Sequence, residues 1–189
     1  MLLAALLGLV AGFVRGGRFR RVGVAGFRRW PLLVAGVAFQ VVGPWLPDGV
    51  GVTAVVLSFA VLIVFALSNL QLTGMAVVTI GMAMNATTIA VNGGMPVRAA
   101  AVVDAGIAEE ADVADLEGVD LGPKRHLERD DDTLMVLSDI IPVALSREVL
   151  SFGDLVMSFG LADVLYRLLR RQPRRGVPPA VDEVAALGA

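Results

Sequence analysis

Apolar residues dominate residues 30–97, and Asp48 is the one charged residue in that stretch. A charge at the centre of a lipid bilayer costs roughly 2.5–3.5 kcal/mol on insertion scales, so a long stretch with almost no charge is typical of a membrane protein. A single spanning helix needs about 20 apolar residues. Because this stretch is several times longer, it is predicted to cross the membrane repeatedly. We therefore expect an all-α, integral membrane protein.

Turn residues divide the apolar sequence into about five predicted transmembrane helices. Proline, glycine and short polar stretches separate the segments, as expected of helix ends. The predicted helices cover residues 1–14, 31–46, 52–67, 72–91 and 152–170. Arginine follows the first helix rather than preceding it, the reverse of a secretory signal, so we expect a span whose N-terminus lies outside. Residues 1–175 are then a single membrane domain, and residues 176–189 a cytoplasmic tail.

The charged residues give this membrane domain a predicted orientation. Eleven of the sixteen basic residues lie in residues 15–29 and 167–175, whereas residues 98–150 contain thirteen acidic and five basic residues. The positive-inside rule places the two arginine-rich stretches, and with them the C-terminus, in the cytoplasm and the acidic segment outside the cell membrane. Arginines that flank a span contact lipid headgroups, so the expected partner is the lipid bilayer and no nucleic acid.

The predicted helix 72–91 differs from the others because one of its faces is small and polar. Gly81, Asn85, Thr88 and Asn92 follow at intervals of four, three and four residues, which places them on one side of a helix. Inside a membrane such a face contacts protein or water rather than lipid. Helix packing, with hydrogen bonds to a neighbouring helix, is the favoured interpretation. A polar site for an ion, a headgroup or a substrate is the alternative.

The last predicted helix, 152–170, has acidic residues at two levels. Ser151 and Asp154 form the S-x-x-D pattern of a capping box. In this motif the side chain of each residue accepts a hydrogen bond from the backbone N–H of the other. Asp163 lies about eleven residues into the helix, which is about 16 Å from the helix start at about 1.5 Å per residue, and Arg167 follows one turn later. This spacing predicts an intramembrane ion pair. A functional role for the Asp163 carboxylate is the alternative.

The acidic segment contains few elements that the sequence defines clearly. Residues 97–116 are predicted to form a surface helix and residues 134–143 an interfacial or partly re-entrant element. His126 precedes a run of aspartates, but the run lacks the spacing of a calcium-binding loop. We interpret it as a solvated turn, with a divalent ion site as the alternative. No soluble-enzyme catalytic motif is present, and neither a metal nor a cofactor is predicted.

Four short motifs follow one another in the second half of the chain. They are Asn92-Gly93-Gly94 with Met95-Pro96-Val97, His126 ahead of Thr133-Leu134, Leu137-Ser138-Asp139-Ile140-Ile141-Pro142, and Ser151-x-Gly153-Asp154. In this order they resemble an uncharacterised bacterial family of polytopic membrane proteins, a domain of unknown function. In that family a residue often separates the second glycine from the methionine, and its absence here implies a shortened loop. The resemblance implies a small polytopic membrane protein and no catalytic residue.

In the predicted topology these motifs all lie at the outer membrane surface, where we expect one polar cluster. Its candidate members are Asn85, Thr88, Asn92, His126, Thr133, Asp139, Ser151 and Asp154. The cluster is either structural, with its side chains bonded to turns and helix ends, or it binds an ion, a headgroup or a small polar substrate.

The expected function is that of a binding or scaffold component of the cell membrane, with another membrane protein or a small polar ligand as its partner. The alternative is a small transporter or membrane enzyme that uses the polar face of helix 72–91 together with Asp154 or Asp163. A transporter predicts a water-filled cavity that joins Asn85 to those carboxylates. A scaffold predicts dry packing there and an exposed apolar face.

Overall fold

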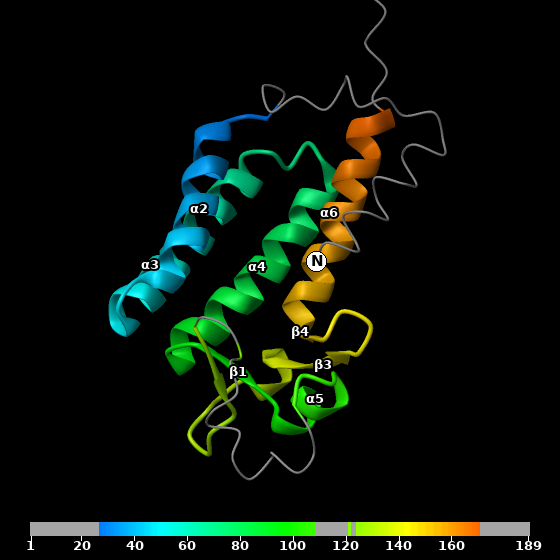
Figure 1. Ribbon diagram of the computed structural model, residues 1–189. Helices are drawn as coiled ribbons and strands as arrows, with labels where there is room; N and C mark the ends of the chain where they lie inside the picture. Colours follow the sequence, from blue (N-terminus) through cyan, green and yellow to red (C-terminus); the bar gives the residue numbers. More distant parts are fainter. Residues whose placement is uncertain (1–26, 109–120, 122–123, 171–189) are drawn as a thin grey trace, which may run out of the picture.

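A layer of helices and a small β-sheet make up the computed structural model, which describes residues 27–108, 121 and 124–170 (Figure 1). Within these residues the long helices are α2 (Trp30–Val42), α3 (Asp48–Leu67), α4 (Thr73–Asn92) and α6 (Phe152–Arg170). Each packs against the next in chain order, and successive helices run in opposite directions. A 3-10 turn, Gly43–Trp45, continues α2 toward α3.

The sheet lies at the end of the helices where α4 ends and α6 begins (Figure 1). Its strands are β1 (Met95–Val97), β2 (Arg125–Leu127), β3 (Asp139–Val143) and β4 (Glu148–Ser151). Their order is β2-β1-β3-β4, with β1 parallel to both of its neighbours and β3 antiparallel to β4. A short helix, α5 (Ala99–Asp104), follows β1. The sheet therefore joins the end of α4 to the start of α6.

The expectation of an all-α protein is wrong, because the acidic segment forms this mixed sheet. Three of the strands are only three or four residues long, too short for an alternating pattern to be recognised. Pro96 lies inside the central strand β1 and Pro142 inside β3, although proline argues against a strand in the sequence. Within the described part of the predicted surface helix 97–116, α5 is the helical portion, and residues 109–116 lie outside the described residues. The predicted interfacial element is a 3-10 turn, Met135–Leu137, followed by β3.

The prediction of five membrane spans is also wrong. In the described part of the chain two helical segments, Gly49–Leu67 and Thr73–Asn92, are long and apolar enough to cross a membrane. Trp30–Trp45 is apolar but shorter, and α6 contains Asp154, Asp163 and Arg167. The predicted first helix, residues 1–14, and the predicted tail lie outside the described residues.

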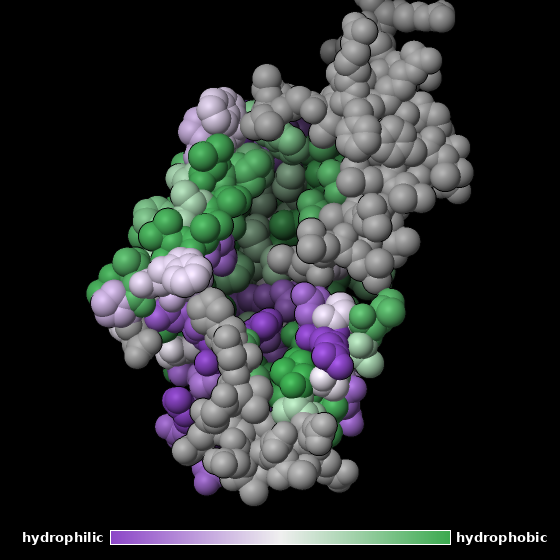
Figure 2. All heavy atoms as spheres, in the orientation of Figure 1, coloured by the Kyte–Doolittle hydropathy of each residue, from purple (hydrophilic) through white to green (hydrophobic). Residues whose placement is uncertain are grey.

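Side chains of opposite character cover the two layers. Hydrophobic residues cover the helices, while hydrophilic residues gather around the sheet (Figure 2). The helices share one apolar core that includes Phe59, Phe65 and Met82. A second, smaller core packs α5 against the sheet through Val97, Val102 and Val149. The polar and apolar halves thus meet at the ends of α4 and α6.

Helices α4 and α6 approach each other closely at two pairs of glycines. A Cβ atom added to Gly81 would lie 2.5 Å from the carbonyl oxygen of Gly153, and one added to Gly160 would lie 2.7 Å from that of Gly74. The glycines of each helix are seven residues apart, so both pairs lie on the facing sides of antiparallel helices. Small residues at such positions let two helix backbones touch.

Substitution Gly160→Ala should lower the free energy of unfolding by about 1–3 kcal/mol, because the added methyl group would overlap the backbone of α4. Thermal unfolding of the purified full chain in a mild detergent measures the change. Gly49→Ala is the matched control, since a Cβ atom there would meet nothing within 4 Å. Equal melting temperatures for the two variants would contradict the proposed backbone contact.

Candidate functional site

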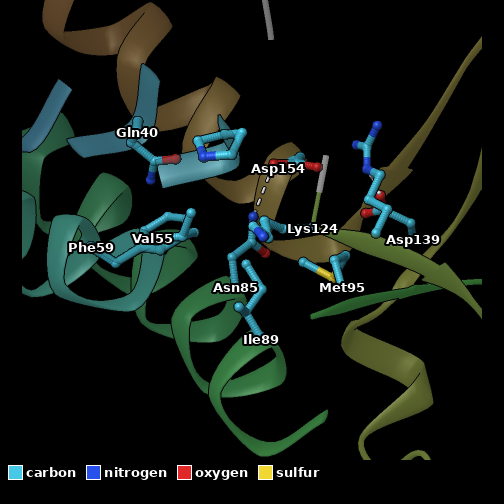
Figure 3. Close-up of a pocket in the computed structure, with 11 residues that line it drawn as sticks. Gln40, Val55, Phe59, Asn85, Ile89, Met95, Lys124, Asp139 and Asp154 are labelled. Carbon is cyan, nitrogen blue, oxygen red and sulfur yellow. Dashed lines mark hydrogen bonds and ion pairs between the residues drawn. The ribbon is translucent and has the colours of Figure 1, made fainter. Parts of the chain in front are cut away.

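A cavity of about 300 Å³ lies between the helices and the sheet. Its lining combines apolar side chains, such as Val55, Phe59 and Ile89, with polar and charged ones (Figure 3). The polar side chains are Gln40 from α2, Asn85 from α4, Asp154 from α6, Lys124 directly before β2, Arg125 at the start of β2, and Asp139 from β3. Residues distant in the sequence therefore surround one space.

Asn85, Ser151 and Asp154 form one hydrogen-bonded network beside this cavity. The Asn85 amide donates to Oδ1 of Asp154 at 2.9 Å and accepts from the Ser151 hydroxyl at 3.0 Å. That hydroxyl also accepts from the backbone N–H of Asp154 at 2.9 Å, while the Ser151 N–H donates to Oδ2 of Asp154 at 3.2 Å. The last two bonds are those of a capping box. The network therefore caps α6 and ties its first turn to α4.

The network depends on Gly153, the residue directly before Asp154. A Cβ atom on Gly153 would collide with Oδ1 of Asn85. Asn85 itself is almost fully buried, and in water-poor surroundings its amide requires partners on both sides. The S-x-G-D sequence supplies both partners and the space between them.

Asp139 is the most unusual group of the cavity, because its carboxylate is only 1% exposed. The Nε of Arg125 lies 2.9 Å from Oδ2, but among the described residues neither oxygen accepts a hydrogen bond of good geometry. Burial raises the pKa of Asp139 to about 7; the positive charge of Arg125 opposes this rise, and the negative charge of Asp154 adds to it. The cavity thus borders a carboxylate that gains or loses its proton near neutral pH.

Lys124 and Arg125 bring positive charge to the same cavity, and sequence reasoning did not select them. The Lys124 ammonium donates to the carbonyl oxygen of Leu46 at 3.1 Å, which links β2 to the α2–α3 connection. The Lys124 carbonyl accepts from the N–H of Met95 at the start of β1. The sequence does contain a signal, since Lys124 and Arg125 are adjacent bases in a segment with thirteen acidic residues.

The remaining members of the predicted cluster lie apart from the cavity. The Asn92 side chain donates to the carbonyl oxygen of Thr133 at 2.9 Å and accepts from the Thr133 N–H at 2.8 Å. Nε2 of His126 lies 3.0 Å from Oδ1 of Asp132. The hydroxyl of Thr88 donates to a carbonyl of its own helix. Among the described residues no group of three or more His, Cys, Asp or Glu side chains is placed to bind a metal ion.

The second carboxylate of α6 lies at a different level of the helix. Nε of Arg167 lies 2.8 and 2.7 Å from the two carboxylate oxygens of Asp163. Both side chains are partly exposed, and neither lines the cavity. The pair is therefore separate from the Asn85 network.

The fold and the cavity fall within a match to one known protein family. A family described as a family of unknown function, DUF5317, matches residues 27–166. The chain belongs to the DUF5317 family. No curated protein and no solved structure matches this DUF5317 chain. Its expected membership of a family of unknown function is confirmed.

Substitution Ser151→Ala should destabilise this DUF5317 chain by about 1–2 kcal/mol, because the helix cap and the hydrogen bond to Asn85 are both lost. Chemical denaturation in detergent measures the difference. Ser146→Ala, at an exposed position of the β3–β4 turn, is the control and should leave stability unchanged. A loss of equal size in both variants would argue against the network.

Stability should fall as the pH rises from about 4 to about 7, because the folded chain binds the Asp139 proton more tightly than the unfolded chain does. Asp139→Asn removes this dependence. The rise of the Asp139 pKa from 3.8 to about 7 is about three units. At about 1.4 kcal/mol per unit, the variant should gain on the order of 4 kcal/mol relative to the parent at pH 8, and at pH 4 it should gain nothing. Melting temperatures across this range provide the measurement. A pH-independent difference between the two chains would contradict the shifted pKa.

Proposed function

We propose that this protein is a membrane protein that binds a small ligand with a protonated amine in the cavity beside Asp139. The observation that carries the proposal is the buried carboxylate, which borders a cavity and receives no well-formed hydrogen bond from the described residues. An amine would supply both the missing donors and a positive charge. Ligand binding would thus compensate the free-energy cost of burying the Asp139 carboxylate without a hydrogen-bond donor.

The outer surface of the helices supports the membrane location. Only 39% of each candidate span, Gly49–Leu67 and Thr73–Asn92, is buried inside the protein. Exposed apolar side chains include Val64 on α3 and Ile80 on α4. An apolar helix in the core of a soluble protein hides such residues from water, whereas lipid accommodates them.

The two ends of the helical layer support an orientation. Arg28 and Arg29 precede α2, and Arg167 lies near the end of α6, at the end opposite the sheet. By the positive-inside rule this arginine-rich end is the cytoplasmic one. In the proposed arrangement the sheet and the cavity then face the outside of the cell, near the headgroups of the outer leaflet.

The lining of the cavity supports the choice of ligand. Asp139 and Asp154 attract a cation, while Lys124 and Arg125 keep the total charge of the site near balance. Val55, Phe59 and Ile89 form an apolar wall on the helical side. A ligand with an amine and an apolar or anionic portion fits this distribution, and ethanolamine-type lipid headgroups and free amines share that chemistry.

Transport of the same ligand is a second candidate function. Asn85 and Asp154 both line the cavity, while Asp163 does not. The pKa of Asp139, raised to about 7, would couple ligand binding to release of a proton. The exposed apolar faces of the helices equally suit a scaffold, and a bound partner protein is the outcome that would favour it.

Binding can be measured by isothermal titration calorimetry on the full chain in detergent, with ethanolamine and short-chain phosphatidylethanolamine as separate probes. Asp139→Asn should weaken binding at least tenfold, because it removes the carboxylate that meets the amine. Asp163→Asn is the matched control, since that carboxylate does not line the cavity. Parent affinity should be higher at pH 8 than at pH 6, as Asp139 must lose its proton.

The two probes distinguish the source of the amine. Binding of the lipid alone identifies a headgroup site, and binding of both identifies a general amine site. Phosphatidylglycerol of the same chain length contains no amine and should bind more weakly than phosphatidylethanolamine. Equal affinities of the Asp139→Asn and Asp163→Asn variants for both amine probes would overturn the proposal.

A further inference from the structure

An apolar groove of about 370 Å³ runs along the helical layer, above the polar cavity. All four long helices contribute to its lining. Representative side chains are Val37 of α2, Leu62 of α3, Met82 of α4 and Leu161 of α6. Figure 2 shows the groove as a hydrophobic hollow between the helices. Apolar surface of this kind marks a site for lipid or for another apolar segment.

The groove has the length of a short helix. Along α6 its lining extends from Met157 to Leu168, which is about 17 Å at about 1.5 Å per residue. Residues 1–14 contain no charged and no polar side chain, and they consist mainly of Leu, Ala, Gly and Val. As a helix they would be about 21 Å long. Their length and composition therefore match the groove.

Phe27, the first residue that the structure describes, lies at the groove. Phe27 is one of the lining residues, and its ring lies 5.7 Å from that of Phe65. The next residue is fixed, because Asn69 accepts from the Arg28 N–H at 2.8 Å and donates to the Arg28 carbonyl at 2.9 Å. The chain ahead of Phe27 thus starts from the rim of the groove, at the arginine-rich end of the helices.

We propose that residues 1–14 of the same chain pack in this groove. The twelve connecting residues, 15–26, can extend over at most about 40 Å, more than twice the length of the groove. Their arginines are excluded from an apolar site, so they remain at the rim while the apolar segment enters. A tethered segment is also present at an effective concentration of about millimolar or more, which favours it over a second copy or a free partner.

The absence of cysteine from the sequence allows a direct test by disulfide scanning. Cysteine is introduced at each of residues 1–14 in turn, together with Leu161→Cys in the groove, and cells that express the full chain are oxidised with copper-phenanthroline. Phe159→Cys is the matched control, because Phe159 lies on the same helix but is 73% exposed and does not line the groove. Intramolecular disulfides should form at least fivefold more with Leu161→Cys than with Phe159→Cys. The reactive positions within residues 1–14 should recur every three or four residues, as on one face of a helix.

Three outcomes would overturn the inference. Equal yields with Leu161→Cys and Phe159→Cys would show no preference for the groove. Disulfide-linked dimers in place of intramolecular bonds would identify a second copy as the occupant. A membrane-permeable maleimide that labels Leu161→Cys equally with and without residues 1–14 would identify a groove filled by lipid. Leu165→Cys, one turn further along the groove, repeats the test independently if Leu161→Cys lowers the melting temperature.

Discussion

The backbone contact between α4 and α6 is the constraint on which the rest of the structure depends. Glycines seven residues apart on each helix bring the two backbones together, so Gly74 faces Gly160 and Gly81 faces Gly153. The contact fixes both the depth and the rotation of α6 relative to α4. One helical turn beyond Gly81, Asn85 then meets the first turn of α6 and bonds Ser151 and Asp154. Helix packing and polar chemistry are therefore consequences of the same close approach.

The sheet follows from that contact. Because α4 and α6 are antiparallel neighbours, the chain between them must leave and return at the same end of the helical layer. It does so through β1, which begins three residues after α4 ends, and β4, which leads directly into α6. Strand β3 fills the space between them, with Asp139 paired to Val97 on one side and to Ser151 on the other. The Asp139 carboxylate is buried by this sheet, outside the apolar spans, and its pKa is raised for that reason.

The elements that could be predicted are those whose signals lie within a short stretch of sequence. Helices α3, α4 and α6 begin and end within four residues of their predicted limits, because uninterrupted apolar runs, turn residues and a capping box are local signals. The sheet depends on contacts between distant residues, and Pro96 and Pro142 argued against its strands. For the same reason the predicted polar cluster was only partly assembled. Asn85, Asp139 and Asp154 line one cavity, and Ser151 bonds two of them. Asn92 and His126 instead bond to loop residues.

The polar side chains of the two layers serve different purposes. Asn85, Ser151 and Asp154 satisfy one another, so their network is explained by stability alone. Asp139 is not explained in this way, because its burial costs free energy and Arg125 compensates only part of that cost. An apolar residue at this strand position would remove the penalty. A buried, poorly satisfied carboxylate beside a cavity is therefore evidence of a binding role, since stability alone gives no reason for it.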